Sequence, residues 1–258
     1  MQCEDIFDIN GILAILEKVS KFQMEKFGNV TIDYKAANEL VTEADIESEK
    51  MLAEFVNRNY PGHGFIGEEI KTVRSDSDYY WVVDPIDGTS NFVNLLLIWG
   101  PCIGIYHKGI PIMGFIFLPV LDRCYLAIKG KGAFCNGKKI KSSSVQTYDK
   151  NKFVGVSSHF FQKYALRLPC KIRMQGSACS NIVFLAQGSY VAFYSDEVKF
   201  WDIAAGILIV KESGGIIQTL EGANLIPIDL EKYNNETYNV VGMANSYLPR
   251  LSHYIEPI

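Results

Sequence analysis

Two carboxylates, Asp84 and Asp87, lie three residues apart at the end of an apolar, β-branched run of the sequence. The run predicts a buried strand. Pro85 predicts that the chain leaves the sheet there, because proline has no N–H for a sheet ladder. Thr89 or Ser90 is a suitable N-cap for a helix that follows. Carboxylates at a strand end suit a hard cation such as Mg²⁺, and N–H groups at a helix start suit a phosphate. The spacing therefore suggests phosphoryl chemistry, although Asp-Pro and Asp-Gly pairs also occur in ordinary turns.

Other acidic residues stand at comparable places in the chain. Glu68 and Glu69 follow a short apolar run that predicts another strand. If this strand is a neighbour of the one before Asp84, Glu68 and Asp84 meet at one edge of the sheet. Asp45 and Asp202 each fall near the start of a predicted helix. Asp45 could there be a simple cap or a favourable charge in the first turn.

The composition is typical of a globular protein and excludes several classes of function. The 258 residues are 48% hydrophobic and 21% charged, and the net charge of −4 argues against a nucleic acid held by bulk electrostatics. The six cysteines form no CxxC pair and no zinc-ligand spacing with the four histidines, so reduced thiols in a cytoplasmic protein are expected. Acidic residues near the N-terminus argue against a signal peptide. The apolar run over 95–106 is interrupted by glycine and proline and is too short to span a membrane.

Periodicity places these residues on elements in two halves. Amphipathic helices are predicted over 5–27, 45–55, 159–168, 177–185 and 201–214. Strands are predicted over 30–35, 65–69, 81–84, 102–106, 112–117, 125–128, 153–156, 172–176, 190–194, 216–217 and 240–241. A polar stretch over 138–152 suggests a seam. We therefore expect an α+β half over 1–140 that carries most of the metal ligands, and an alternating α/β half over 141–258 that carries Asp202 and the substrate-side loops.

Four segments in this order resemble the inositol monophosphatase family. They are 40–45 (Leu-Val-Thr-Glu-Ala-Asp), 67–69 (Gly-Glu-Glu), 84–89 (Asp-Pro-Ile-Asp-Gly-Thr) and 201–206 (Trp-Asp-Ile-Ala-Ala-Gly). The resemblance covers nearly the whole chain. It implies an α/β (α+β) fold, a layered α/β/α/β/α sandwich. It also implies a magnesium-dependent, lithium-sensitive phosphomonoesterase, related to fructose-1,6-bisphosphatases and bisphosphate nucleotidases.

The resemblance also implies a role for individual residues. Two or three Mg²⁺ ions would be held by Glu68, Asp84, the carbonyl of Ile86, Asp87 and Asp202. Glu68 and Thr89 would hold the water that attacks phosphorus, with Asp45 behind Thr89. Such a displacement depends mainly on positioning and on cations, because charge spreads over several oxygens in the transition state. The substrate-side residues would be Asp87, Gly88, Thr89, Gly176, Ser177, Ala178, Ser195 and Asp202.

Two positions depart from the animal inositol-phosphate enzymes of this family. Ser195 stands where those enzymes carry a glutamate that holds inositol hydroxyls, and Lys199 stands where they often carry histidine. Lys199 could favour a second phosphate, as in fructose 1,6-bisphosphate, or it could be a solvated lysine. The metal side of the site is thus complete by sequence, whereas the inositol side is changed.

The favoured function is hydrolysis of inositol monophosphate or a related small sugar phosphate. Alternatives are a fructose-1,6-bisphosphatase, a bisphosphate nucleotidase or NADP phosphatase, or a regulatory protein that keeps the fold and binds RNA or a transcription complex. A nucleotide hydrolase or kinase with a Walker loop is set aside, because the chain has no GxxxxGK[ST] segment. The family further implies a homodimer, and no membrane or nucleic-acid partner is expected.

Overall fold

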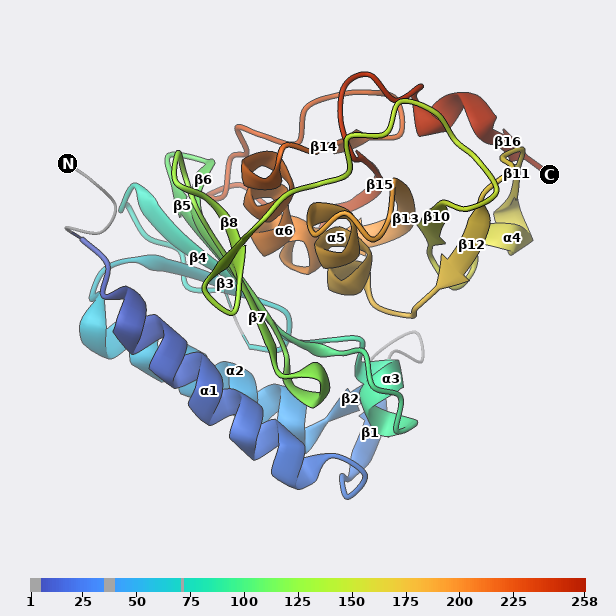
Figure 1. Ribbon diagram of the computed structural model, residues 1–258. Helices are drawn as coiled ribbons and strands as arrows, with labels where there is room; N and C mark the ends of the chain where they lie inside the picture. Colours follow the sequence, from blue (N-terminus) through green and yellow to red (C-terminus); the bar gives the residue numbers. More distant parts are fainter. Residues whose placement is uncertain (1–5, 35–39, 71) are drawn as a thin grey trace.

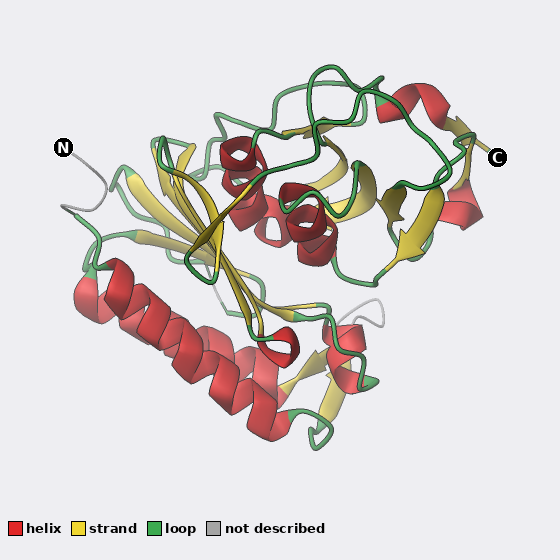
Figure 2. Ribbon diagram, viewed as in Figure 1, coloured by secondary structure: helices red, strands yellow, loops and turns green. Residues whose placement is uncertain are grey.

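Helices and sheets alternate in layers in the computed structural model, which describes residues 6–34, 40–70 and 72–258 (Figure 1). Two long helices cover one face of a seven-stranded sheet, and two further helices lie between that sheet and a five-stranded sheet (Figure 2). Short elements cover the outer face of the five-stranded sheet. This arrangement is the α/β/α/β/α sandwich that the resemblance implied, so the predicted fold class is confirmed.

The two sheets divide the strands along the chain. The seven-stranded sheet runs β3-β4-β5-β6-β7-β8-β9. Its strands are β3 (Gly64–Gly67), β4 (Tyr79–Asp87), β5 (Gly100–His107), β6 (Ile110–Leu118), β7 (Arg123–Ile128), β8 (Gly132–Cys135) and β9 (Lys138–Ile140). The five-stranded sheet runs β12-β10-β13-β15-β14. Its strands are β10 (Phe153–Val156), β12 (Lys171–Met174), β13 (Ala192–Lys199), β14 (Ile216–Thr219) and β15 (Thr237–Met243).

Two small antiparallel pairs and the helices complete the described elements. The pairs are β1 (Ile32–Tyr34) with β2 (Leu40–Thr42), and β11 (Tyr164–Leu166) with β16 (Ile255–Pro257). The helices are α1 (Ile9–Lys26), α2 (Glu43–Asn59), α3 (Thr89–Val93), α4 (Phe160–Lys163), α5 (Ala178–Ala186) and α6 (Phe200–Ser213). Two 3₁₀ helices, Pro119–Leu121 and Leu251–Tyr254, lie in connections.

The alternation of side chains along β4 separates two cores. Trp81 and Val83 pack with α1 and α2, whereas Tyr80 and Val82 pack in the core that α5 and α6 share with both sheets. Because strand side chains alternate with a period of two, Asp84 continues the second row. The sequence pattern of β4 therefore directs the Asp84 carboxylate toward α6.

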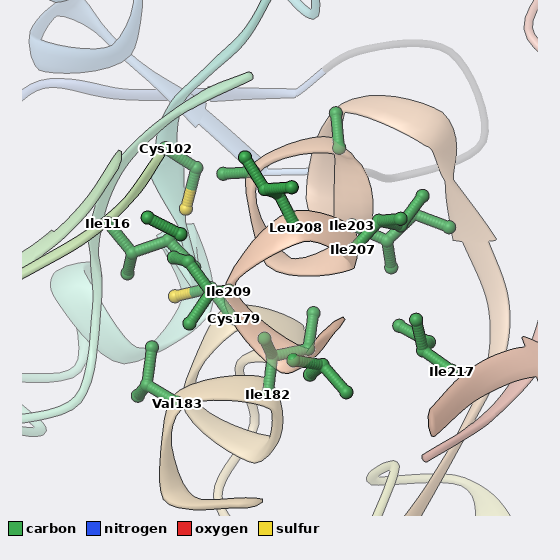
Figure 3. Packing of buried hydrophobic residues seen from close by; sticks show 14 of the residues in the cluster. Cys102, Ile116, Cys179, Ile182, Val183, Ile203, Ile207, Leu208, Ile209 and Ile217 are labelled. Atoms are coloured by element: carbon green, nitrogen blue, oxygen red, sulfur yellow. The ribbon is translucent and has the colours of Figure 1, made fainter. Parts of the chain in front are cut away.

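Small residues let α6 lie close to the seven-stranded sheet. A Cβ added to Gly104 would lie 2.9 Å from the backbone of Ala204, and one added to Gly114 would lie 2.3 Å from the Ala205 carbonyl oxygen. Aliphatic side chains of α6 pack in one buried core with Cys102 and Cys179, and Figure 3 shows Ile203 and Ile207 on the side of Ile217, away from the two thiols. This close contact brings the first turn of α6 to the end of β4.

Some local predictions were wrong. The helix expected over 159–168 is only α4 (Phe160–Lys163), and β11 follows it because its residues pair with β16. Leu95, Leu96 and Leu97, which begin the apolar run over 95–106, follow α3 and are more than half exposed. The strand expected over 30–35 is present as β1, and residue 35 lies outside the described residues.

Cys3 also lies outside the described residues, while the other five cysteines carry free thiols.

No helix in the described ranges combines the length and the apolar character that crossing a membrane requires.

Candidate active site

Three carboxylates from separate elements meet at one edge of the seven-stranded sheet. Glu68 follows β3, Asp84 lies on β4, and Asp202 lies in the first turn of α6. One oxygen from each carboxylate lies within 4.8 Å of the other two, close enough for one ion to bind all three. β3 and β4 are parallel, with Gly67 opposite Val83, so the next residues along each strand, Glu68 and Asp84, leave the sheet side by side. The sequence prediction that these two residues meet at one edge is confirmed.

Asp84 is the most deeply buried of the three carboxylates. Its side chain is 1% exposed, and among the described residues no donor reaches its Oδ1 atom. Burial raises the pKa of Asp84 well above its ordinary value, and the nearby carboxylates of Glu68, Asp87 and Asp202 raise it further. Burial and the nearby carboxylates of Glu68 and Asp87 also raise the pKa of Asp202. A buried carboxylate oxygen without a donor fits a cation, because a buried charge is costly unless it is paired or coordinated.

The Thr89 hydroxyl contacts Asp45 and the backbone of β4 at Ile86, two residues after Asp84. Thr89 Oγ1 lies 3.1 Å from Asp45 Oδ1 and 3.1 Å from the Ile86 carbonyl oxygen. The other oxygen of Asp45 accepts hydrogen bonds from the backbone and the hydroxyl of Thr42, at 2.8 and 2.6 Å. Asp45 thus closes the capping box of α2 and also fixes Thr89. The contact between Asp45 and Thr89 is the one that the family resemblance implied.

Gly88, rather than Thr89 or Ser90, is the N-cap of α3. Its φ of 89° and ψ of 40° lie in the left-handed region, which glycine adopts without steric cost. Thr89 is therefore the first helical residue, and its hydroxyl is turned toward Asp45 instead of capping the helix. The cap prediction was wrong because the turn needs a positive φ at the cap position.

Asp87 joins the cluster to the loop before α5. Its Oδ2 accepts hydrogen bonds from the Ser177 hydroxyl and, at 3.0 Å, from the Cys179 N–H, and its Oδ1 accepts one from Ala178 N–H at 3.1 Å. Burial raises the pKa of Asp87, although these hydrogen bonds oppose the effect. Asp87 lies outside the group of three carboxylates, so its assignment as a metal ligand stays a prediction.

The Gly176–Ala178 loop also contacts the α3 segment, through hydrogen bonds of Asn91. Asn91 Nδ2 donates to the carbonyls of Ile98 and Gln175, at 2.6 and 2.7 Å. A Cβ on Gly176, whose φ is +71°, would lie 2.7 Å from Asn91 Oδ1. The loop predicted on the substrate side is therefore beside the helix start at Gly88. Asn91 was not predicted as a site residue from the sequence, where the only available indication is a polar residue in a short predicted helix.

Ser195 and Lys199 are each engaged by a partner outside the group of three carboxylates. Ser195 is 2% exposed, and its Oγ accepts a hydrogen bond from Asn181 Nδ2 at 3.4 Å, between β13 and α5. The Lys199 ammonium donates to the carbonyl of Asn235 at 2.7 Å in an exposed position. The backbone N–H of Lys199 donates to Asp202 Oδ2 at 2.8 Å and so fixes that carboxylate.

Sequence reasoning missed a group of buried polar side chains on α1 and α2. Gln23 Nε2 donates to Ser48 Oγ at 3.0 Å and to the Pro85 carbonyl at 2.8 Å. Glu49 accepts hydrogen bonds from two backbone N–H groups after Glu68, and burial raises its pKa to about 7. Polar residues at the apolar spacing of a helix were the available signal. Ile46 on α2 is 36% exposed, whereas the polar side chains of Asp45, Ser48 and Glu49 are buried.

Comparisons with known proteins agree with this fold. A sequence model described as the inositol monophosphatase family matches residues 9–252. A fructose-1,6-bisphosphatase/inositol-1-monophosphatase from Aquifex aeolicus is 31% identical over 87% of this chain and 90% of its own. Inositol monophosphatase 1 from Mus musculus is 34% identical over 74% of each chain. The crystal structure of the extragenic suppressor protein suhB from Bartonella henselae has a TM-score of 0.81 at 25% identity, over 93% of this chain and 94% of that one.

The site and the fold together define a phosphatase whose reaction depends on metal ions. The chain belongs to the inositol monophosphatase family.

Proposed function

We propose that this protein is a Mg²⁺-dependent phosphomonoesterase that hydrolyses inositol monophosphate or a related small sugar phosphate. The observation that carries the proposal is the meeting of Glu68, Asp84 and Asp202, together with the buried Oδ1 of Asp84, which no hydrogen-bond donor of the described residues reaches. Oxygen ligands from carboxylates are those that Mg²⁺ prefers. The names of the related enzymes support both inositol phosphate and fructose bisphosphate as substrate classes.

Glu68, Asp84 and Asp202 would hold the metal, with the Ile86 carbonyl and Asp87 as further candidates for a second or third ion. When bound, Mg²⁺ supplies positive charge that favours deprotonation of a water and offsets the charge of the phosphate. Asp87 would contribute only if its hydrogen bonds to the start of α5 leave an oxygen lone pair toward the cluster.

The Thr89 hydroxyl would orient the attacking water. Its single hydrogen is directed to Asp45 Oδ1 or to the Ile86 carbonyl, so its lone pairs are left to accept a hydrogen bond from a water. A proton that leaves the water toward Thr89 could pass from Thr89 Oγ1 to Asp45 Oδ1. Glu68 would hold the same water from the other side.

The phosphate would lie at the start of α3. The Gly88 and Thr89 N–H groups are at the beginning of that helix, where backbone donors have no intrahelical acceptor. The Gly176–Ala178 loop next to it would contact the alcohol part of the substrate. Ser195 is buried and the Lys199 ammonium donates to the Asn235 carbonyl, so the substrate class we propose is a small polyol phosphate without a second charged group.

The test is phosphate release from a panel of substrates with Mg²⁺, with and without EDTA. The panel contains inositol 1-phosphate, fructose 1,6-bisphosphate, a 3′,5′-bisphosphonucleotide, NADP and 2-glycerophosphate. We expect metal-dependent turnover of inositol 1-phosphate or another sugar phosphate, and a loss of more than about a hundredfold in Asp84→Asn, because buried charges that stabilise a transition state contribute on this scale.

The matched control is Asp229→Asn, which removes an exposed aspartate paired with Lys232. Its turnover should equal that of the unmodified protein. Near-normal activity of Asp84→Asn would contradict the proposed site. The absence of turnover on every substrate would instead favour a regulatory protein that keeps the fold.

The proposal extends to a cytoplasmic homodimer that lithium inhibits, as the family resemblance implies. Analytical ultracentrifugation tests the dimer, and a lithium titration of phosphate release tests the inhibition. A monomer, or turnover that lithium leaves unchanged, would remove that part of the proposal and leave the reaction intact.

A further inference from the structure

Glu49 is a fully buried carboxylate that the proposed reaction does not use. It projects from α2 and is 0% exposed. Its oxygens accept hydrogen bonds from two successive backbone N–H groups, Oε2 from Glu69 at 2.7 Å and Oε1 from Ile70 at 3.1 Å. Both N–H groups belong to the segment directly after Glu68. With both oxygens engaged by main-chain donors, the carboxylate is arranged to hold backbone.

The backbone around Glu68 has left the sheet where Glu49 contacts it. β3 ends at Gly67, so the register with β4 stops one residue before Glu68, and residues 68–70 form a bend. The chain returns to β3 through hydrogen bonds between Phe65 and Val73, at 2.9 and 2.8 Å. Between these two points, the side chain of Glu49 accepts two backbone hydrogen bonds that fix the bend.

Gly67 provides the space for this contact. A Cβ at Gly67 would lie 1.7 Å from Glu49 Oε1 and 2.5 Å from its carboxyl carbon. Such a contact is far inside van der Waals distance, so any larger residue at position 67 would displace the carboxylate. The Glu49 carboxylate can therefore reach the backbone after Glu68 only because residue 67 is glycine.

The burial of Glu49 has an energetic cost that its two hydrogen bonds offset. A buried carboxylate is unfavourable unless it is paired or hydrogen-bonded. Next to Glu68 and Glu69, which are also acidic, Glu49 stands in a region of like charge. An apolar side chain would avoid this cost but would leave the two N–H groups without their acceptor.

We propose that Glu49 is a positioning residue for Glu68. By holding the Glu69 and Ile70 N–H groups, it sets the backbone from which the Glu68 carboxylate reaches Asp84 and Asp202. The inference rests on the proposed function, because it assigns Glu49 to the metal site of that function. Residues that orient a metal ligand from behind typically change metal affinity 10- to 100-fold when they are replaced.

The test is Mg²⁺ binding to the full chain, measured by isothermal titration calorimetry. For Glu49→Gln, which keeps the volume and one acceptor, we expect Kd to rise about 10- to 100-fold. The matched control is Glu47→Gln on the same helix, whose side chain is about half exposed and pairs with Lys50. Leu52→Val, one turn further along the buried face of α2, controls for lost stability. Both controls should bind Mg²⁺ as the unmodified protein does, although Leu52→Val unfolds at a lower temperature.

A double-mutant cycle separates positioning from general destabilisation. If Glu49 acts through Glu68, the Glu49→Gln penalty on Kd disappears in a Glu68→Gln background, because contacting residues act non-additively. Should Glu49→Gln not fold, Glu49→Asp keeps the charge but withdraws the oxygens, and the same rise in Kd is expected. Unchanged Kd in a folded Glu49 variant, or an undiminished penalty in the Glu68→Gln background, overturns the inference while the proposed function stands. If the unmodified protein neither binds Mg²⁺ nor releases phosphate, both fall.

Discussion

At the scale of single residues, the proposed reaction uses only the hydroxyl group of the Thr89 side chain. Its hydroxyl contacts Asp45 and the Ile86 carbonyl, whereas its methyl group has no assigned part in the chemistry. Thr89→Ser should therefore keep most of the phosphatase activity. Thr89→Val keeps the shape without the hydroxyl and should lower kcat by about a hundredfold or more, the usual range for a lost proton-transfer group.

The measurement is kcat and KM for phosphate release with the best substrate of the panel. Ser90→Ala is the matched control, since Ser90 is the exposed neighbour in the same helix turn. A Thr89→Val protein as active as Thr89→Ser would show that the hydroxyl does not orient the water.

Single residues also mark how far the sequence could predict the site. Spacing and the family resemblance were sufficient to select Glu68, Asp84 and Asp202, because each stands at a strand end or a helix start. They could not select Glu49, since its role depends on a bend of the chain that touches α2 only in the folded structure. The direction of the Ser195 side chain was equally unpredictable, because it depends on contact with Asn181.

At the scale of elements, the contact of α6 with the sheet determines where Asp202 lies. Gly114 faces the Ala205 carbonyl, and the methyl group of Gly114→Ala would lie 2.3 Å from that oxygen. The helix would have to move away from β6, at a cost of about 1–3 kcal/mol for an overpacked core. We expect Gly114→Ala to lower both the unfolding temperature and the activity per folded molecule, because Asp202 moves with the helix.

Val154→Ala provides the comparison for Gly114→Ala. Val154 is buried in the outer core of the five-stranded sheet, away from the first turn of α6. This variant should lose stability and keep its turnover number. Thermal unfolding and phosphate release measured on the same preparations distinguish the two effects, and full activity in Gly114→Ala would show that the helix position is not critical.

Elements with a long, regular pattern were predicted well, and short ones were not. The apolar stripe of α1 and the β-branched run of β4 appear at the expected places, because each buries a continuous face. The region after α4 pairs as β11 with β16, a strand far along the chain. Local sequence cannot specify such a partner, so the helix expected over 159–168 was too long.

At the scale of the whole molecule, the buried carboxylates link stability to pH and to metal. Without metal, the folded state raises the pKa values of Asp84, Asp87 and Asp202 above those of the unfolded chain. The folded state then binds protons to these three carboxylates more tightly than the unfolded chain does. Protonation of the three carboxylates therefore stabilises the folded state fully below about pH 4, and this stabilisation is lost as pH rises toward the folded pKa values. Under the proposed function, Mg²⁺ would bind the ionised carboxylates and offset this loss of stability.

The expected result is a rise in unfolding temperature with Mg²⁺ that is larger at about pH 8 than at about pH 5.5. At roughly a hundred times Kd, a ligand stabilises the folded state by about 2.7 kcal/mol. Differential scanning calorimetry with and without Mg²⁺ measures this difference, and Asp84→Asn should reduce it at both pH values. An equal effect of Mg²⁺ at both pH values would contradict the assignment.

The origin of the three carboxylates on distant parts of the chain has a consequence for the time course of folding. Glu68 and Asp84 come together as soon as β3 and β4 pair, but Asp202 arrives only when α6 docks from the other half of the sequence. Contacts between distant segments form late, because closing a long loop costs conformational entropy before any favourable contact is made. A complete ion site should thus be absent from the folding transition state. We therefore expect Mg²⁺ to slow unfolding markedly while leaving the refolding rate almost unchanged, which stopped-flow experiments with and without the ion would measure.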